Sequence, residues 1–482
     1  MPPHVRVVAL SPLKTATILW RPRADAAVLT VVCKATYAIE PGESPLAEAQ
    51  DDVNERDLHA MNNPKLGLHS ASDLVPFKAK ADVTLVGKAY SPPGELARAL
   101  VARLKVGSVD KRVSVHADRF LRKSGRIEDE KFFSKMALGY ENAPGGEGTD
   151  NPVGIGLDGE RDRKGRLALP NLQHPDDRLN GANTKLRPVG FGPLPATWPT
   201  RRTLAGGYDG AWLEGDFSDE PLPGDWNWGY FNVAPEDQQL AEIAADAAIL
   251  LEHLHPEEAK LETRLPGLVP VVYAERGSGA QRVELEGDTL WIDTNRLVAT
   301  LTWRGPLQLE TPDDDVRLIV TMAKAGEELG WDAAWQLAEA KESFDGTEDD
   351  ADDNRKTIAR PPRTRLDSPS GVGPSSARPQ TAPVPLVPSS DHTPGWMPPQ
   401  GPSSSSGPMS ASPGSLGPVS SGRMAPGSSG QPPGSGLILE LQLSDTETAM
   451  LRKLCNAMGY DAVDMVKHAL QEAHRARFGD EE

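Results

Sequence analysis

Two short motifs hold the side chains best suited to chemistry: the HLH at residues 253–255 and the HAD at residues 116–118. Histidines two positions apart share one side of a strand and can bind zinc, but this pair precedes Pro256, at the end of a predicted helix. No cysteine or carboxylate pattern completes a ligand set. The HAD motif would need an anchored serine, and the sequence contains no G-x-S-x-G elbow. We therefore predict no metal, no cofactor, no catalytic residue and no enzymatic activity.

The two cysteines, Cys33 and Cys455, are predicted to be unreactive. Cys33 lies inside an apolar run and Cys455 lies on the apolar face of a predicted helix, so we expect nothing nearby to lower the pKa of either thiol. Two isolated cysteines do not form a disulfide framework, which favours a reducing compartment. The glycine-rich segment GIGLDGERDRKG, residues 154–165, is predicted to be a loop, because no apolar helix follows it as in a phosphate-binding loop.

Aromatic residues concentrate in DWNWGYFNVAPEDQ, residues 225–238, although the chain as a whole is only 5% aromatic. They can be the core beneath a long loop, or an exposed platform for a partner, a sugar or a nucleic acid. Adjacent polar residues that can cover the cluster favour the core for most of them. Because aromatic residues also dominate interface hot spots, the candidate partner-binding residues are Trp198, Tyr208, Trp212, Trp226, Trp228 and Phe231.

Runs rich in Val and Thr, with partial alternation of apolar and polar residues, predict a mainly β domain over residues 1–345. The pair Gly107–Ser108 marks a hairpin within one of these runs. The domain is expected to be sandwich-like, with a few helices. The clearest predicted strand regions are residues 27–40, 81–90, 99–120 and 282–305.

Helical patterns are predicted at two places in this domain. The first is PEDQQLAEIAADAAILLEHL, residues 235–254, and the second is residues 312–343, where Gly326 and Gly330 interrupt the pattern. We expect these helices to accompany the β-sheets without changing the fold class.

The formal net charge of −18 argues against a general nucleic-acid-binding protein, which needs a basic surface to displace counterions. Residues 1–40 lack the charged leader, apolar block and cleavage site of a signal peptide. No segment approaches the roughly 20 apolar residues that cross a bilayer. The chain is therefore expected to be a soluble, cytoplasmic protein.

Residues 346–435 are predicted to be a disordered linker, acidic at first and then rich in Pro, Ser and Gly. Residues 436–482 regain order: LILELQL predicts a strand, SDTE opens a helix, and Gly459 separates that helix from a second one. This β-α-α tail resembles a ribbon–helix–helix module, in which two copies share one core.

The resemblance implies a homodimer formed through the tail. In that family the outward strand side chains enter the DNA major groove. Here Glu440 and Gln442 would occupy those positions, and a carboxylate beside phosphates disfavours nucleic acid. The residues assigned to dimerisation are Leu439, Leu441, Leu443, Leu451, Leu454, Val466 and Leu470.

Five longer blocks follow one another over roughly residues 1–306, among them HSASDLVPFKAKADVTLVGKAYSP and LEGDTLWIDTNRLVATLTWRG. Together they resemble the bacterial family called domain of unknown function 2169. Members of that family occur beside type VI secretion genes. They are understood as adaptors, or chaperones, that load a toxic effector onto the secretion spike, typically with a spike-tip PAAR-repeat protein. The blocks are residues 69–92, 106–120, 169–175, 187–238 and 285–305.

The resemblance implies a non-enzymatic adaptor whose partners are a secretion effector and a spike or PAAR-type protein, with no membrane partner. Within its blocks, Asp73, Lys78 and Asp82 are predicted to be internal pairs that fix strand connections. Two alternatives stay open. A carbohydrate-active or other hydrolase would use the Trp-rich loop as a sugar platform, and a DNA-binding regulator would use the tail.

Overall fold

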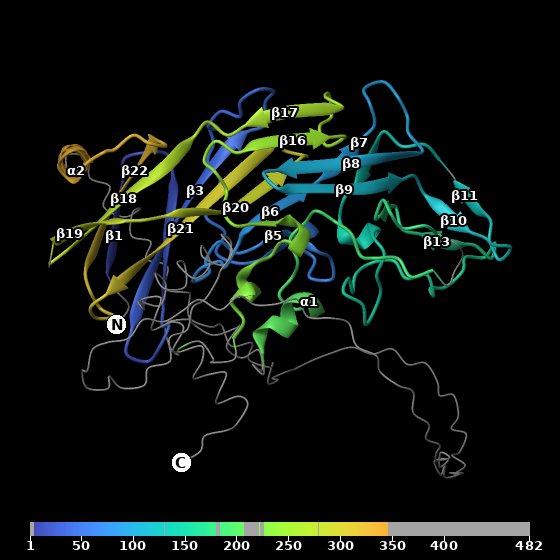
Figure 1. The fold of residues 1–482 in the computed structure, drawn as a ribbon, viewed down its shortest axis with the longest axis horizontal. Helices are drawn as coiled ribbons and strands as arrows, with labels where there is room; N and C mark the ends of the chain where they lie inside the picture. Colours follow the sequence, from blue (N-terminus) through green and yellow to red (C-terminus); the bar gives the residue numbers. More distant parts are fainter. Residues whose placement is uncertain are drawn as a thin grey trace, which may run out of the picture. The chain divides into compact units, whose positions relative to one another are not determined.

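The computed structural model describes residues 4–129, 131–179, 184–206, 221, 226–277 and 279–345 (Figure 1). The predicted linker, residues 346–435, and the predicted tail, residues 436–482, lie outside the described residues, and so do all seven residues assigned to dimerisation. Tyr208 and Trp212 also lie outside them. Within the described part, no helix is long and apolar enough to cross a membrane.

A six-stranded sheet forms one layer, in the order β15-β6-β20-β21-β3-β2. β6 runs parallel to β20, and the other neighbours are antiparallel. The long pair of β3 and β21 is in register over its whole length, with Lys34 opposite Thr302. The strands are β2 Lys14–Trp20, β3 Ala27–Ala38, β6 Ala81–Val86, β15 Gln239–Leu240, β20 Glu286–Asp293 and β21 Val298–Leu309.

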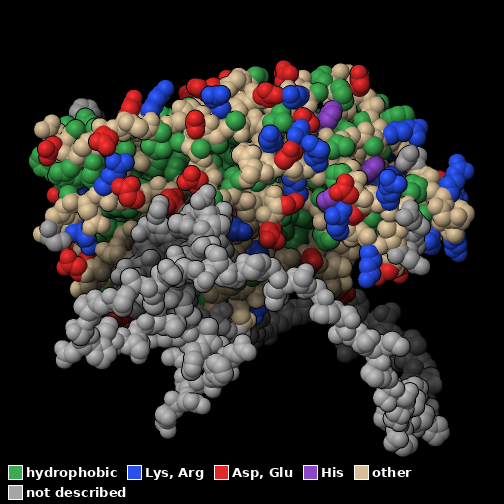
Figure 2. Space-filling view, viewed as in Figure 1, with side chains coloured by type: hydrophobic (Ala, Val, Ile, Leu, Met, Phe, Trp, Pro, Cys, Tyr) green, Lys and Arg blue, Asp and Glu red, His purple; other side chains and the backbone are tan. Residues whose placement is uncertain are grey.

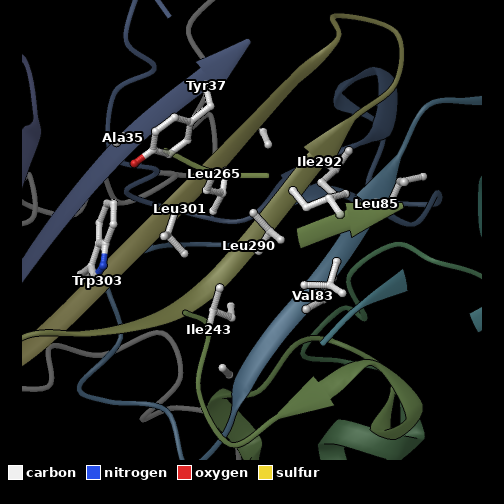
Figure 3. Packing of buried hydrophobic residues seen from close by; sticks show 14 of the residues in the cluster. Ala35, Tyr37, Val83, Leu85, Ile243, Leu265, Leu290, Ile292, Leu301 and Trp303 are labelled. Atoms are coloured by element: carbon white, nitrogen blue, oxygen red, sulfur yellow. The ribbon is translucent and has the colours of Figure 1, made fainter. Parts of the chain in front are cut away.

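A five-stranded antiparallel sheet, in the order β14-β9-β8-β16-β17, packs against one face of the first sheet. Because side chains alternate along a strand, each sheet offers one apolar face to the shared core. Tyr37, Ile292 and Leu301 point into it from three strands of the larger sheet (Figure 3). The strands of the second sheet are β8 Ala99–Val106, β9 Val109–His116, β14 Leu172–Gln173, β16 Ala248–Glu252 and β17 Lys260–Arg264.

A four-stranded sheet, in the order β1-β22-β18-β19, adds its inner face to the same core. Its outer face is covered by α2 Trp331–Asp345, whose Ala334 and Ala338 pack on Ile319 and Tyr273. Arg317 secures the helix by pairing with Glu339 and Glu342, at 2.8 and 2.6 Å. The strands are β1 Val5–Ala9, β18 Leu268–Arg276, β19 Gly279–Val283 and β22 Val316–Lys324.

Shorter elements connect the sheets. A three-stranded sheet in the order β11-β10-β13 has its own small apolar cluster, built on Leu121, Leu167 and Leu169. Its strands are β10 Arg119–Leu121, β11 Ile127–Asp129 and β13 Leu167–Leu169. The remaining elements are β4 Leu58–His59, β5 Leu68–Ser70, β7 Lys88–Tyr90, β12 Lys135–Ala137, α1 Pro199–Arg202, η1 Ala60–Asn62, η2 Tyr140–Asn142, η3 Thr203–Ala205, η5 Trp228–Phe231 and η6 Glu236–Gln238.

The predicted mainly β, sandwich-like class is confirmed, and so is the hairpin at Gly107, which joins β8 to β9. The predicted helix over residues 235–254 is wrong. That region forms η6, β15, a series of turns and β16. Ile249 and Leu251 alternate into the core from β16, which pairs with β8 and β17, so strand pairing overrides the helical propensity of the alanine-rich run.

The second predicted helix, residues 312–343, is half correct. Its first half is β22. The side chains of this strand alternate between the main core and the face of the sheet that α2 covers. Gly326, at φ +90°, turns the chain after the strand, and the helix begins only at Trp331. Gly326 and Gly330 therefore mark the boundary between a strand and a helix.

Cys33 is buried in the core on β3, as predicted. Burial raises the pKa of its thiol to about 12. At about pH 8 only about one thiol in ten thousand is then ionised, so iodoacetamide should leave Cys33 unmodified in the native chain. Peptide mass spectrometry checks this, with the same reaction in guanidinium chloride as the control. Native labelling at the rate of a free peptide thiol would contradict the prediction.

Candidate functional site

The second face of the six-stranded sheet is polar, yet it is buried. Several of the residues that alternate with the apolar core residues on β3, β6 and β21 carry charges or hydroxyl groups. The chain between β3 and β6, residues 39–80, supplies partners for several of them. The buried polar residues of this face include Lys34, Thr36, Asp82, Thr84, Thr300, Thr302 and Arg304.

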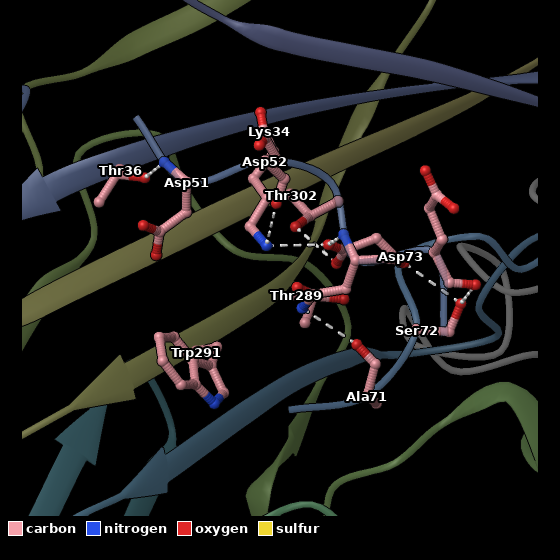
Figure 4. Close-up of polar contacts among 12 residues, drawn as sticks. Lys34, Thr36, Asp51, Asp52, Ala71, Ser72, Asp73, Thr289, Trp291 and Thr302 are labelled. Carbon is pink, nitrogen blue, oxygen red and sulfur yellow. Dashed lines mark hydrogen bonds and ion pairs between the residues drawn. The ribbon is translucent and has the colours of Figure 1, made fainter. Parts of the chain in front are cut away.

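One charge network on this face is centred on Asp73 (Figure 4). Its carboxylate accepts hydrogen bonds from Lys34 Nζ at 2.9 Å, from the backbone N–H of Asn54 at 2.8 Å and from Thr302 Oγ1 at 3.2 Å. Arg304 donates to the backbone carbonyl of Asp73 at 2.7 and 3.0 Å, and it also pairs with the Asp288 carboxylate. The predicted role of Asp73 as an internal partner is confirmed.

A second network is centred on Asp82 of β6. Lys78 Nζ lies 2.7 Å from one carboxylate oxygen, and the backbone N–H of Val233 donates to the same oxygen at 2.8 Å. Asn232 Nδ2 donates to the other oxygen at 2.9 Å. Lys78 and Asp82 therefore form the predicted internal pair, and the same carboxylate also fixes the chain that follows the aromatic cluster.

The aromatic cluster is a small core of its own. Trp226, Tyr230 and Phe231 pack on one another around η5, with ring centroids 4.7 to 5.8 Å apart. Trp228 is half-buried and joins them to Phe77 and Trp20, at 4.4 and 5.9 Å. Asn227 caps η5 by accepting a hydrogen bond from the backbone of Gly229. Most of the aromatic surface is therefore used inside the protein.

Arg201 of α1 ties the preceding loop to this cluster. Its guanidinium donates to the backbone carbonyl of Tyr230 at 2.9 and 3.1 Å and to that of Leu194 at 2.7 Å. Only 6% of Arg201 is exposed, and the structure gives it no carboxylate partner among the described residues. Three hydrogen bonds leave two of the five guanidinium N–H donors for other acceptors.

A cleft of about 660 Å³ opens beside these residues, and we call it the Trp198 cleft. Trp198 is itself only 4% exposed and packs edge-on against Tyr140, with ring centroids 5.1 Å apart. The Tyr140 hydroxyl donates to the carbonyl of Gly192, and burial raises its pKa. The cleft is lined by Lys80, Lys111, Tyr140, Trp198, Arg201 and Asp237, among others.

The charges of the Trp198 cleft are unequally buried. Lys111 occupies an inward-facing position of β9, where burial lowers the pKa of its ammonium group. Its Nζ lies 2.8 Å from Asp237, which counteracts part of that shift and is largely exposed. Lys80 has no carboxylate partner in the described part of the chain. The inner wall is thus cationic, while the acidic groups lie at the rim.

Comparison with known families matches residues 24–304 to the family described as "Uncharacterized protein conserved in bacteria (DUF2169)". The chain belongs to this family. The match includes both charge networks and the aromatic cluster. No curated protein and no solved structure matches the chain.

The two histidines of the HLH motif in this DUF2169 protein contact the backbone. His253 Nδ1 lies 3.2 Å from the carbonyl of Tyr90, and His255 Nδ1 accepts hydrogen bonds from the backbone of Glu257 and Glu258. Among the described residues, no group of three or more His, Cys, Asp and Glu is arranged to hold a metal ion. Asp118 of the HAD motif accepts a hydrogen bond from Asn171.

The structure brings together four of the six predicted partner-binding residues. Trp226, Trp228 and Phe231 share one cluster, and Trp198 lines the cleft together with Asn227 and Gly229 from the same loop as the cluster. The sequence did not reveal Lys34, Arg304 or the cleft. A single charged residue in a Val- and Thr-rich strand was the available signal for the two cations, and it does not distinguish a buried charge from an exposed one.

Proposed function

We propose that this DUF2169 protein is a non-enzymatic adaptor, or chaperone, that binds a type VI secretion effector and loads it onto the spike through a PAAR-type protein. The observation that carries the proposal is membership of the family over residues 24–304, together with the adaptor role that the resemblance implies. A secretion adaptor must hold an effector without altering it, so its site needs shape and charge rather than reactive groups.

The Trp198 cleft supports this proposal as the place where a segment of the effector binds. Its volume suits a few side chains of an extended peptide. Trp198, Tyr140 and Arg201 line the cleft through small exposed areas, 4%, 5% and 6% of each residue, and Lys80 offers an ammonium group that no described carboxylate uses. The surrounding loops are held by the buried charge networks, which keeps the cleft preformed and limits the ordering cost of binding.

The packing of the aromatic cluster favours an adaptor over a sugar-binding hydrolase. A sugar platform needs exposed ring faces, whereas Trp226 and Phe231 are 7% and 2% exposed and stack on their neighbours. The DNA-binding alternative depends on the tail, outside the described residues. A gel-shift assay at physiological salt tests it, and we expect no specific complex because of Glu440.

Effector capture by the full-length chain tests the proposal. The tagged chain, co-expressed with the products of the genes adjacent to its own, should retain one of them through purification. Thr200→Arg places a bulky cation at an exposed position that lines the Trp198 cleft, and it should weaken this binding at least about tenfold. Isothermal titration with the captured protein measures the change.

The matched control is Thr203→Arg, because Thr203 is also exposed but does not line the cleft. It should bind like the parent chain. Equal affinity of the two variants would exclude the cleft as the docking site. Failure of the parent chain to bind or stabilise any neighbour-encoded protein would reject the adaptor itself. Deletion of residues 436–482, followed by light scattering, tests the predicted homodimer.

A further inference from the structure

Two turns with the same backbone geometry lie side by side at one end of the β11-β10-β13 sheet. In the first, Gly125 N donates to Arg122 O and Arg122 N donates to Arg126 O, both at 2.9 Å. In the second, Gly165 N donates to Asp162 O and Asp162 N donates to Arg166 O, both at 2.8 Å. We call residues 122–126 and 161–166 the paired turns. Each places a glycine at positive φ, which fits a type I turn followed by a glycine bulge.

Strand register brings the paired turns together. Leu121 of β10 lies opposite Ile127 of β11 and also opposite Leu167 of β13, so both turns leave the sheet at the same end. The guanidinium of Arg161 bridges them by donating to the carbonyls of Leu121 and Gly165, at 2.9 and 3.1 Å. The two turns are also joined through the apolar cluster, because Leu121 directly precedes the first turn and Leu167 directly follows the second.

The paired turns read RKSGR and RDRKGR, a concentration of positive charge in a chain whose net charge is −18. Figure 2 shows Lys and Arg side chains gathered on the right, over β10, β11 and β13. Two of the arginines are neutralised locally, because Arg122 pairs with Glu128 at 2.6 Å and Arg166 pairs with Asp162 at 2.8 Å. Two further acids, Asp158 and Glu160, precede the second turn.

Besides the half-buried Arg161, which donates to backbone carbonyls, four cations of the paired turns have no ion-pair partner within the described residues. They are all exposed, and they come two from each turn. Like charges on adjoining turns repel one another where they lie within a Debye length of about 8–10 Å, and binding an anion relieves that repulsion. The four cations are Lys123, Arg126, Arg163 and Lys164.

We propose that the paired turns are a docking surface for an acidic segment of a partner polypeptide. A short acidic segment would contact only this local patch, where its charges lie within the Debye screening length of the cations. A nucleic acid extends further and would meet the acidic remainder of the surface, which repels it. The inference is independent of the proposed function, because it concerns a different surface from the Trp198 cleft.

Fluorescence anisotropy with a labelled oligo-glutamate peptide and the full-length chain tests the proposal. The parent should bind the peptide, and added salt should weaken the binding. Charge reversal at the four unpaired positions, K123E/R126E/R163E/K164E, should weaken it by about tenfold or more. The partial variant R126Q/K164Q should give an intermediate loss, and thermal unfolding should show that both variants keep the parent fold.

The matched control reverses four other exposed cations without a described ion pair, R56E/K65E/K105E/R264E, and so changes the net charge equally. It should weaken peptide binding less than twofold, because it changes only the long-range electrostatic attraction that follows from the net charge. Equal losses in the two quadruple variants, or no binding by the parent, would overturn the proposal. Tighter binding of an oligodeoxythymidine of matched charge, lost in the first variant, would overturn it in favour of a nucleic-acid surface.

Discussion

Replacement of Asp82 by alanine is expected to lower the free energy of unfolding by about 3–5 kcal/mol. Asp82 is fully buried, and its carboxylate is the only ion-pair partner that the structure gives Lys78 among the described residues. Alanine would leave a lysine ammonium with 1% of its side chain exposed and no counter-charge. Breaking one side of a buried pair is costly because the remaining charge stays desolvated. Urea unfolding of the full-length chain measures the loss.

Asp82 should also affect the aromatic cluster. The lost carboxylate is the acceptor for the backbone N–H of Val233 and for Asn232 Nδ2, which hold the chain after η5. Hydrogen exchange at Val233 should therefore be faster in the variant, even where the protein remains folded. Lys78→Met should destabilise less than Asp82→Ala, because Asp82 keeps two donors when the lysine is removed.

Asp52→Ala is the control for this prediction. Its carboxylate pairs with Lys14 at 2.9 Å but is 86% exposed, so its removal should cost less than about 1 kcal/mol. A loss for Asp82→Ala that is no larger than the loss for Asp52→Ala would contradict the structural role of Asp82.

The sequence predicted the fold class because its Val- and Thr-rich runs favour strands and alternate in part. The run AVLTVVCKATYA predicts a strand, and period two places Cys33 and Lys34 on opposite faces. It does not say that the face of Lys34 is covered. The covering residues, Asn54 and Asp73, come from an irregular segment whose path depends on long-range contacts. A charged strand residue is ordinarily at the surface, so sequence alone places it in solvent.

The candidate cleft was hidden for a related reason. Its walls come from segments as distant as Lys80, Lys111, Trp198 and Asp237, and only the fold brings them together. The failed helix over residues 235–254 has the same origin. Its alanines favour a helix locally. Its Ile and Leu residues, however, lie on β16, which pairs with β8 and β17, and both of these strands come from outside residues 235–254.

Arg304→Met is expected to lower the free energy of unfolding by about 3–5 kcal/mol. Methionine retains much of the aliphatic volume of the arginine but none of its donors. The Asp288 carboxylate, with 5% of its side chain exposed, would lose its cation and, among the described residues, keep only the Thr289 hydroxyl as a donor at 2.8 Å. The carbonyl of Asp73 would lose two hydrogen bonds in the same step. Urea unfolding with tryptophan fluorescence measures the change.

A double replacement separates the charge from the packing. If the unpaired Asp288 carboxylate causes most of the loss, then Arg304→Met combined with Asp288→Asn should lose less than the sum of the two single variants, by about 1–3 kcal/mol. Arg296→Met is the matched control. Arg296 pairs with Asp51 at 2.7 Å, but its side chain is 48% exposed, so the same substitution should cost less than about 1 kcal/mol. Strict additivity of the double replacement, or equal losses for Arg304→Met and Arg296→Met, would show that the buried face does not depend on its charges. Close packing of the side chains, and not their charges, would then account for the stability of the polar face.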